Sequence, residues 1–227
     1  MTKRMNPAYA IKGVYAITPD CANTTDLLHR VRLALAGKIR ILQYRNKSAN
    51  SVQRLEQAHA LRKLTREFAI PFIVNDDVQL AAQVDADGVH LGVADDSVDT
   101  ARAALGIHKI IGVSCYNRLP LAQNAVHAGA DYVAFGAFFP STIKPNAEVA
   151  DIELLRQARA ELTVPLVAIG GITLGNAASL VHAGADALAV ISTIFDAEDI
   201  MATAKKMATL FNSNRLPTGR LASQGYS

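Results

Sequence analysis

The 227-residue sequence contains no tryptophan and only two cysteines, Cys21 and Cys115. They lie far apart and lack metal-ligand spacing, so the chain has neither a disulfide framework nor a zinc site, and this usage favours a reducing compartment. No run of 18 or more apolar residues is present, which argues against a transmembrane helix. Residues 1–12 also lack the long apolar core of a signal peptide. We therefore expect a cytoplasmic protein with no membrane partner.

Strong charge of either sign is also missing from the body of the chain. The formal net charge is +3, but residues 1–12 carry three bases and residues 213–227 carry two, with no acid in either segment; removing these five charges leaves the rest at −2. A basic body and aromatic side chains for base stacking are typical of nucleic-acid-binding proteins. We therefore expect small-molecule substrates and no nucleic-acid partner. A homo-oligomer is compatible with the sequence, which carries no signal for the number of subunits.

Short apolar runs alternate with amphipathic segments at a fairly even period, which predicts eight strand–helix pairs. The expected strands are residues 13–17, 39–44, 72–74, 88–91, 110–114, 132–136, 165–169 and 187–191. The expected helices are residues 25–36, 51–68, a short segment before residue 85, 98–105, 119–128, 152–162, 176–183 and 197–211. The strands are too apolar to face water on either side, so we predict an α/β fold consisting of a single (β/α)8 TIM barrel.

This barrel accounts for residues 13–212, with residues 1–12 as an N-terminal extension and residues 213–227 as a flexible tail. The alternative is an open doubly wound sheet. A nucleotide-binding version would need a glycine-rich turn after its first strand, where this chain has Thr18-Pro19-Asp20.

An internal repeat supports the barrel. Residues 127–131 and 182–186 both read His-Ala-Gly-Ala-Asp, each directly before a predicted strand, and residues 85–88 are a looser version. In this pattern the glycine takes the left-handed conformation that ends a helix, and a short polar link starts the next strand. His127 and His182 fall in the last helical turn, where the helix dipole favours a cation, so we interpret both as structural.

Acidic side chains follow two neighbouring strands. The third predicted strand ends in Asn75-Asp76-Asp77, and the fourth is followed by Asp95-Asp96. The carboxyl ends of parallel strands meet at the edge where ligands bind, and two carboxylates there suit Mg²⁺. Aspartates in such loops also cap helices, which is the alternative explanation. Asp77 and Asp96 are placed as caps, which leaves Asp76 and Asp95 for the metal.

The second strand continues into an unusually polar segment. Gln43, Arg45 and Lys47 share one side of an extended chain by period-two alternation. A guanidinium and an ammonium two residues apart suit a diphosphate, and an exposed positive loop is the alternative. Beside two predicted Mg²⁺ ligands, the diphosphate site is favoured.

Two further segments at the carboxyl ends of strands are suited to anions. Ser141, Thr142 and Lys144 lie on a loop between two prolines. Gly170-Gly171 ends the seventh strand, and residues 190–193 end the eighth; loops seven and eight are the usual phosphate site of this barrel. No Ser-His-Asp or Cys-His arrangement is evident. His90, within the fourth strand, is interpreted as a hydrogen-bonded core residue, and Cys115 as a packed hydrophobe.

These motifs, in their order along the chain, resemble the thiamine phosphate synthase (thiamine-phosphate pyrophosphorylase) family. The resemblance covers about residues 13–211 and rests on Gln43–Lys47, Val74–Asp76, Asp87–Gly92 with Asp95, Gly112–Ser114, Phe135–Lys144, Gly170–Ile172 and Val190–Ser192. It implies a Mg²⁺-dependent barrel enzyme that joins hydroxymethylpyrimidine diphosphate to thiazole phosphate and releases pyrophosphate. Our hypothesis for the mechanism is a dissociative substitution.

The resemblance also assigns individual residues. It implies that the pyrimidine diphosphate is bound by Gln43, Tyr44, Arg45, Asn46, Lys47, Asn75, Ser114 and Lys144. It implies Mg²⁺ at Asp76 and Asp95, and thiazole phosphate at Ser141, Thr142, Ile143, Gly171, Ile191 and Ser192. In our hypothesis for the mechanism, the catalytic residues are Arg45, Lys47 and Lys144, which would stabilise the negative charge on the departing pyrophosphate.

Two positions depart from the family pattern. Ile143 stands where the family's Thr-x-Thr-Lys motif has its second threonine, and Val93 stands where a glutamine usually follows His-Leu-Gly. Two alternatives to a synthase are a thiazole tautomerase-like paralogue and a catalytically silent phosphate-binding barrel. The tautomerase needs no diphosphate site, so the combination of Arg45, Lys47, Asp76 and Asp95 disfavours it.

Overall fold

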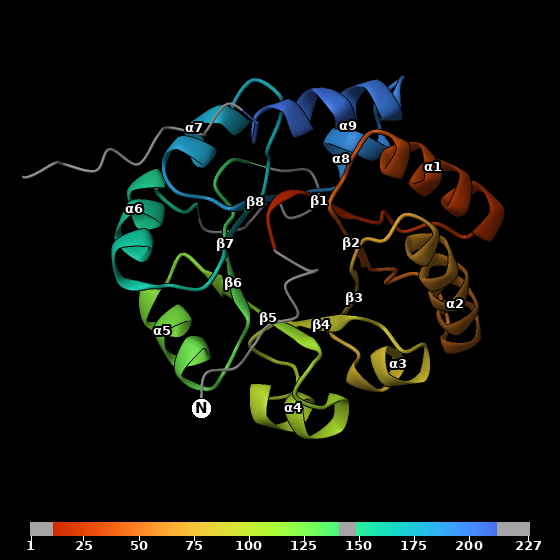
Figure 1. Cartoon of the computed structure of the whole chain (residues 1–227), viewed down its shortest axis with the longest axis horizontal. Helices are drawn as coiled ribbons and strands as arrows, with labels where there is room; N and C mark the ends of the chain where they lie inside the picture. Colours follow the sequence, from red (N-terminus) through yellow and green to blue (C-terminus); the bar gives the residue numbers. More distant parts are fainter. Residues whose placement is uncertain (1–10, 141–148, 213–227) are drawn as a thin grey trace, which may run out of the picture.

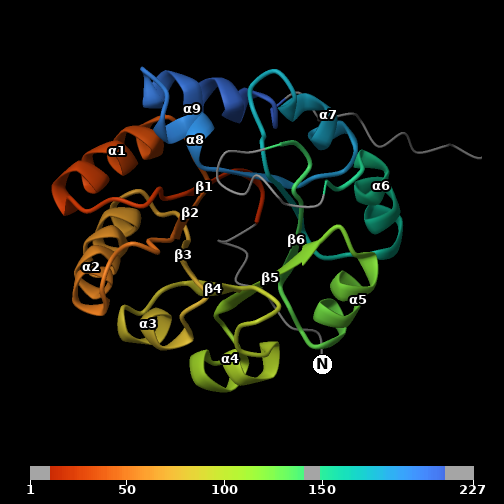
Figure 2. The same ribbon diagram turned by 180° about the vertical axis from the view of Figure 1, so that it is seen from behind.

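The structure, a computed structural model, describes residues 11–140 and 149–212. Its eight parallel strands close into a barrel in the order of the sequence, and the helices form an outer ring (Figures 1 and 2). The predicted (β/α)8 barrel is therefore confirmed. The strands are β1 (Gly13–Ile17), β2 (Ile41–Tyr44), β3 (Phe72–Asn75), β4 (Gly88–Leu91), β5 (Ile110–Tyr116), β6 (Tyr132–Phe135), β7 (Leu166–Ile169) and β8 (Ala187–Val190).

The helices lie close to their predicted positions, with one addition. They are α1 (Thr24–Ala36), α2 (Ser51–Glu67), α3 (Val78–Gln83), α4 (Val98–Leu105), α5 (Leu119–His127), α6 (Ile152–Glu161), α7 (Ala177–His182), α8 (Ser192–Phe195) and α9 (Ile200–Thr209). The short helix α8 was not predicted, because residues 192–193 were placed at the end of the eighth strand. Within the described ranges, no helix has the length and apolarity needed to cross a membrane.

The barrel has two apolar layers that together fix the position of the site. An outer layer lies between the strands and the helices, and it is the larger of the two. An inner layer fills the barrel itself and is formed by alternate residues of the strands, among them Tyr15, Ile41, Ile73, Ile110 and Tyr132. Because the strands are packed on both faces, polar side chains collect where the strands end.

Helix starts show which aspartates act as caps. Asp77 was predicted to cap α3, and this is confirmed, since its Oδ1 accepts a hydrogen bond from the Leu80 N–H at 2.8 Å. The prediction that Asp96 caps the following helix is wrong. Ser97 caps α4 instead, and its hydroxyl oxygen accepts from the Thr100 N–H at 3.1 Å. Helix α4 begins at Val98, so only Ser97 stands directly before the first helical residue, where a cap must be.

The repeated segments end helices and also place an aspartate at the start of a strand. His127 and His182 lie in the last turns of α5 and α7, as predicted, and Gly129 and Gly184 have φ angles of 93° and 112°. We call the end of the barrel where the strands begin the lower rim, and the end where they finish the upper rim. The aspartates of these segments lie on the lower rim.

Asp87 shows what such an aspartate does. Its two carboxylate oxygens accept hydrogen bonds from the Arg62 guanidinium of α2 at 2.6 and 2.9 Å, and one also accepts from the Phe72 N–H of β3. Both side chains are buried, so the pair is shielded from water. Two similar clamps join Arg102 to Asp131 with the Ile111 N–H, and Arg159 to Asp186 with the Leu166 N–H.

Candidate active site

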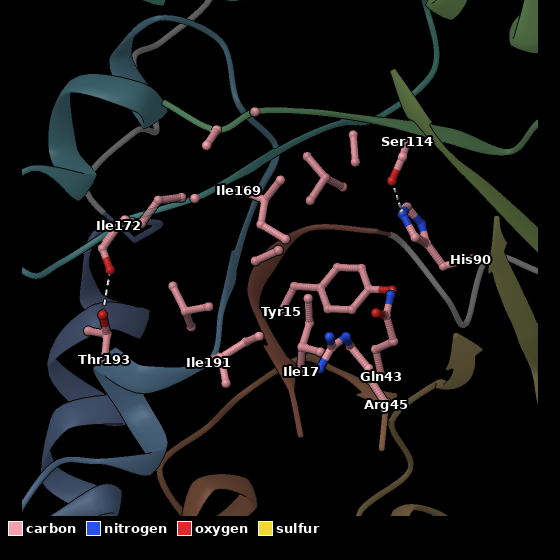
Figure 3. Close-up of a pocket in the computed structure, with 18 of the residues that line it drawn as sticks. Tyr15, Ile17, Gln43, Arg45, His90, Ser114, Ile169, Ile172, Ile191 and Thr193 are labelled. Atoms are coloured by element: carbon pink, nitrogen blue, oxygen red, sulfur yellow. Dashed lines mark hydrogen bonds between the residues drawn. The ribbon is translucent and has the colours of Figure 1, made fainter. Parts of the chain in front are cut away.

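The upper rim opens into a cavity of about 950 Å³, a size suited to a small ligand. Its walls combine aliphatic side chains with a few polar groups. Figure 3 shows Gln43, His90 and Ser114 on one side and Ile172 and Thr193 on the other. A smaller cavity of about 370 Å³ adjoins it, and Arg45 and Asn75 line both. The two cavities together suit a ligand with an apolar part and a charged part.

The two predicted metal ligands meet at this rim. Burial raises the pKa of Asp76 to about 6, and hydrogen bonding and repulsion from the Asp95 carboxylate act in the same direction, while Lys47 lowers it. Asp95 is held by the Gly92 N–H, which donates to its Oδ2 at 2.6 Å. Asp76 has a φ of 62°, a left-handed conformation that is unusual for a residue other than glycine. Two facing carboxylates are an arrangement that a cation would stabilise.

The loop after β2 is fixed by residues that the sequence analysis did not single out. The buried Thr18 hydroxyl donates to the Arg45 carbonyl oxygen at 2.8 Å and accepts from the Arg45 N–H at 2.9 Å. Asp20 accepts from the Lys47 N–H at 2.8 Å and contacts the Arg45 guanidinium at 3.3 Å. These contacts hold both cations at the edge of the smaller cavity, beside Asp76. The segment Thr18-Pro19-Asp20, which follows β1, therefore holds the loop after the neighbouring strand β2 in place.

Tyr44 and Asn46 use their side chains differently from Arg45 and Lys47. Both line the smaller cavity, but the Tyr44 hydroxyl and the Asn46 amide donate to Oε1 of Gln57 on α2, at 2.9 and 3.0 Å. Asn46 also donates to the Cys21 carbonyl oxygen at 2.8 Å. The structure thus gives these two side chains a bracing role, and the prediction that they contact substrate remains a prediction.

The floor of the main cavity is polar. Gln43 is only 3% exposed, and its Nε2 donates to the Tyr15 hydroxyl at 2.8 Å. His90 lies within hydrogen-bonding distance of the Tyr132 hydroxyl and of Ser114 Oγ, at 2.9 Å each. The interpretation of His90 as a hydrogen-bonded core residue is confirmed, and the residue also lines the cavity.

The opposite wall combines a glycine loop with the short helix α8. Gly170 and Gly171 have φ angles of 99° and 59°, and a Cβ on Gly171 would lie 2.3 Å from the Pro140 carbonyl oxygen, so this position requires glycine. The Thr193 hydroxyl donates to the Ile172 carbonyl oxygen and ties α8 to this loop. A glycine loop after strand seven and a short extra helix after strand eight form the phosphate site of many such barrels.

Not every predicted site residue can be placed. Gly171, Ile191 and Ser192 line the main cavity, together with Gln43, Arg45, Asn75 and Ser114. The predicted Ser141, Thr142, Ile143 and Lys144 lie outside the described residues. Cys115 is buried, and burial raises the pKa of its thiol to about 12, which agrees with its interpretation as a packed hydrophobe.

Several lining residues were missed by sequence reasoning. Tyr15, Asn117 and Arg118 all line the main cavity. A usable signal existed for Tyr15, because a tyrosine within a short aliphatic strand must find a hydrogen-bond partner inside the barrel. Asn117 and Arg118 follow a predicted strand, where a polar pair is too common to be informative.

Comparisons with known proteins agree on one family. Residues 14–194 match the family model described as thiamine monophosphate synthase. The chain is 56% identical over 212 residues to the thiamine-phosphate synthase of Methylobacillus flagellatus, a match that covers 93% of this chain and 100% of that protein. It is 52% identical to the thiamine-phosphate synthase of Aromatoleum aromaticum, over 91% of this chain and 100% of the relative.

Solved structures give the same result. The thiamine phosphate pyrophosphorylase from Pyrococcus furiosus superposes with a TM-score of 0.81 at 35% identity, covering 91% of this chain and 98% of the other. The orotidine 5'-phosphate decarboxylase from Pyrococcus horikoshii, at 17% identity and a TM-score of 0.63, shares the fold alone; the match covers 87% of this chain and 99% of that one.

Proposed function

Because the chain belongs to the thiamine monophosphate synthase family, we propose that it is a transferase that joins hydroxymethylpyrimidine diphosphate to thiazole phosphate. The products are thiamine phosphate and pyrophosphate. In this reaction the bond between the pyrimidine methylene carbon and the diphosphate oxygen breaks, and its electron pair leaves with pyrophosphate. The thiazole nitrogen then forms the new bond to the methylene carbon.

The observation that carries this proposal is the meeting of cations and carboxylates beside a largely aliphatic cavity. Arg45 and Lys47 border the smaller cavity together with Asp76, and Arg45 also reaches the main cavity. A diphosphate in the smaller cavity would leave its pyrimidine in the main one. The guanidinium can bind two phosphate oxygens as a fork, and the ammonium can add a point charge.

The donor set fits Mg²⁺. Asp76 and Asp95 present carboxylate oxygens, and burial, together with the neighbouring Asp95, raises the pKa of Asp76. A cation bound between the two carboxylates would favour their ionised forms. Among residues 11–140 and 149–212, no group of three or more acidic, histidine or cysteine side chains could hold a metal. Two protein carboxylates with the remaining ligands from phosphates and water is the usual arrangement for Mg²⁺. When bound there, the ion would supply positive charge to the leaving pyrophosphate.

The protein's own residues would act by position and charge. Arg45 and Lys47 would hold the diphosphate and stabilise the charge that grows on it as the methylene bond breaks. The pyrimidine's amino group can delocalise the positive charge on the methylene carbon, so no protein nucleophile is required. Lys144, outside the described residues, is proposed to add a third positive charge.

The thiazole phosphate is proposed to bind at the opposite wall. Gly171 allows close approach of its backbone, and the first N–H groups of α8 have no partner within the helix. Ile191 and Ser192 lie at the same place on the cavity wall. This arrangement would put the thiazole nitrogen across the aliphatic cavity from the diphosphate, so the two substrates would meet at the methylene carbon.

The proposal is tested by incubating the protein with both phosphorylated substrates, with and without Mg²⁺, and measuring thiamine phosphate by mass. We expect product only with Mg²⁺, and near-complete loss in Arg45→Ala. The matched control is Arg32→Ala, since Arg32 is an exposed arginine of α1 that pairs with Glu67. Substrate binding without product would favour a silent phosphate-binding barrel, and proton exchange on the thiazole without product would favour a tautomerase.

A further inference from the structure

Five side chains from five strands form one hydrogen-bonded row across the cavity floor, and we call it the polar row. Gln43 Nε2 lies 2.8 Å from the Tyr15 hydroxyl, which lies 2.8 Å from the Tyr132 hydroxyl. The Tyr132 hydroxyl lies 2.9 Å from His90 Nδ1, and His90 Nε2 lies 2.9 Å from Ser114 Oγ. Figure 3 shows the two ends of the row, Gln43 and Ser114, with His90 beside the latter.

The direction of each hydrogen bond follows from the first. The Gln43 amide nitrogen can only donate, so the Tyr15 oxygen accepts from it. The Tyr15–Tyr132 bond could run either way by distance alone, but among the described residues only the Tyr132 oxygen can accept the Tyr15 hydrogen, so that hydrogen passes to Tyr132. The Tyr132 hydrogen must then point at His90 Nδ1, which has to be bare to accept it. A neutral imidazole with a bare Nδ1 carries its hydrogen on Nε2 and donates it to Ser114.

We propose that the polar row fixes His90 as the Nε2–H tautomer and thereby makes the Ser114 hydroxyl a hydrogen-bond donor to the bound ligand. Ser114 Oγ accepts from His90, so its own hydrogen remains for the cavity that the residue lines. The ligand atom opposite Ser114 is then an acceptor, and a ligand that presents an N–H or O–H there is disfavoured. This inference rests on the proposed function, in which that ligand is the pyrimidine diphosphate. His90, Tyr15 and Tyr132 are positioning residues.

Burial makes the row difficult to reverse or interrupt. Tyr15 and Tyr132 are 1% and 0% exposed, and burial raises the pKa of both hydroxyls, so each keeps its hydrogen. A buried hydroxyl whose hydrogen is left without a partner is costly, which favours arrangements in which every hydrogen of the row is accepted. The row therefore has two low-energy states, one for each direction, and the amide of Gln43 selects between them.

The ring positions are fixed by packing as well. Tyr132 stacks on His90 with 5.5 Å between ring centroids, and it meets Tyr15 edge-on at 6.1 Å. A Cβ on Gly112 would lie 2.0 Å from Cζ of Tyr132, so only glycine at this position of β5 leaves room for the ring. Gly112 is also the register partner of both His90 and Tyr132. The absence of a side chain at Gly112 thus leaves space for the contact between Tyr132 and His90.

The tautomer can be read from the imidazole ¹⁵N chemical shifts of the whole ligand-free protein, with the His90 signals assigned by their loss in His90→Gln. We expect the shift of a bare nitrogen at Nδ1 and of a protonated nitrogen at Nε2. The opposite pattern, or a doubly protonated ring at pH 8, would overturn the proposal. This measurement needs no substrate, so it stands or falls independently of whether the protein makes thiamine phosphate.

A pair of variants tests whether Gln43 sets the direction. Gln43→Met removes the donor at similar volume, and we expect the His90 signals to move toward a mixture of both tautomers. The control is Gln57→Met, because Gln57 is also buried and hydrogen-bonded to a tyrosine hydroxyl but lies outside the row. Unchanged tautomer signals in a folded Gln43→Met protein would contradict the proposed control by Gln43. If that variant fails to fold, the wild-type spectrum still decides the tautomer.

Turnover gives a second readout at Ser114. Loss of a hydrogen bond to a charged ligand corresponds to about a tenfold or larger change in affinity, so Ser114→Ala should raise KM for the pyrimidine diphosphate by about that factor. KM for thiazole phosphate should stay the same. An equal rise in both KM values, or no rise in either, would show that Ser114 does not donate to the pyrimidine substrate.

Discussion

At the lower rim Asp87 accepts two hydrogen bonds from Arg62, whereas at the upper rim Asp76 faces a second carboxylate, Asp95. Both aspartates flank strands of the same barrel, and both are at least partly buried. The lower pair is complete within the protein, because opposite charges and a backbone N–H satisfy every oxygen. The upper pair lacks a balancing charge between its two carboxylates, because two groups of like charge lie next to each other. Arg45 and Lys47 line the same cavity as Asp76.

The difference shows how one scaffold separates stability from function. A buried carboxylate with its partner removed is strongly destabilising, so the lower rim tolerates little change. Like charges held together are themselves destabilising, and such an arrangement persists where a ligand completes it. Substitutions at the lower rim should therefore reduce stability, and substitutions at the upper rim should reduce turnover.

Removing a lower-rim carboxylate should give the largest loss of stability. Asp87→Ala leaves the Arg62 guanidinium buried without its partner, and we expect the free energy of unfolding to fall by about 3–5 kcal/mol. Urea denaturation followed by circular dichroism measures it. The matched control is Glu67→Gln, which breaks an exposed pair with Arg32 and should cost less than about 1 kcal/mol. Equal losses in the two variants would remove the distinction between buried and exposed pairs.

Removing an upper-rim carboxylate should affect turnover instead. We expect Asp76→Asn to lower kcat by about 10²–10³-fold, because one source of charge stabilisation for the leaving group is lost. The melting temperature without metal should not fall, since the variant also relieves repulsion with Asp95. Steady-state kinetics at saturating substrate and thermal melting test both statements. Near-normal turnover would overturn the assignment of Asp76 to the metal.

Mg²⁺ should stabilise the protein in a pH-dependent way. The pKa of Asp76 in the folded protein, about 6, lies above its ordinary value of 3.8, so the metal-free native state loses stability as the pH rises through about 6. Mg²⁺ binds the ionised pair, so it should raise the melting temperature by a few degrees at pH 8 and by little at pH 5. Asp76→Asn should show no such dependence, and the same rise at both pH values in the wild type would argue against binding at this pair.

The third lower-rim clamp should show the smallest effect. Arg159 and Asp186 are both about one-third exposed, at 37% and 30%, so water can replace part of what is lost. We expect Asp186→Ala to cost about 1 kcal/mol, clearly less than Asp87→Ala. Urea denaturation of the two variants side by side checks the ranking. A loss for Asp186→Ala as large as that for Asp87→Ala would show that burial does not set the strength of these clamps.

Much of the fold was predictable because the determining signals are local. Apolar runs and the repeated His-Ala-Gly-Ala-Asp segments are visible within ten residues, and they located every strand. Asp76 and Asp95 could be predicted as a pair because Asp76 directly follows β3 and Asp95 lies in the short loop after the neighbouring β4. Helix α8 was missed because Ile191-Ser192-Thr193 is β-branched and polar and continues the pattern of β8.

The polar row shows why the rest of the site could not be predicted from the sequence. Tyr15 and Tyr132 are 117 residues apart in the chain, and neither belongs to a motif that points to the other. Which tyrosine meets which histidine depends on strand register, and a shift of one residue would turn each side chain to the other face. The choice between Asp96 and Ser97 as the cap of α4 depends on a single position in the chain, and a pattern of apolar residues does not locate the start of a helix that accurately.

Each clamp on the lower rim is self-contained in the chain, spanning residues 62–87, 102–131 or 159–186. The barrel is thus assembled from modules of consecutive sequence, each tying a helix to the following strand and to the start of the next. A circular permutant with its new termini within residues 92–97 would cut no clamp, and the same modular layout would let one unit be exchanged for its counterpart from a related chain.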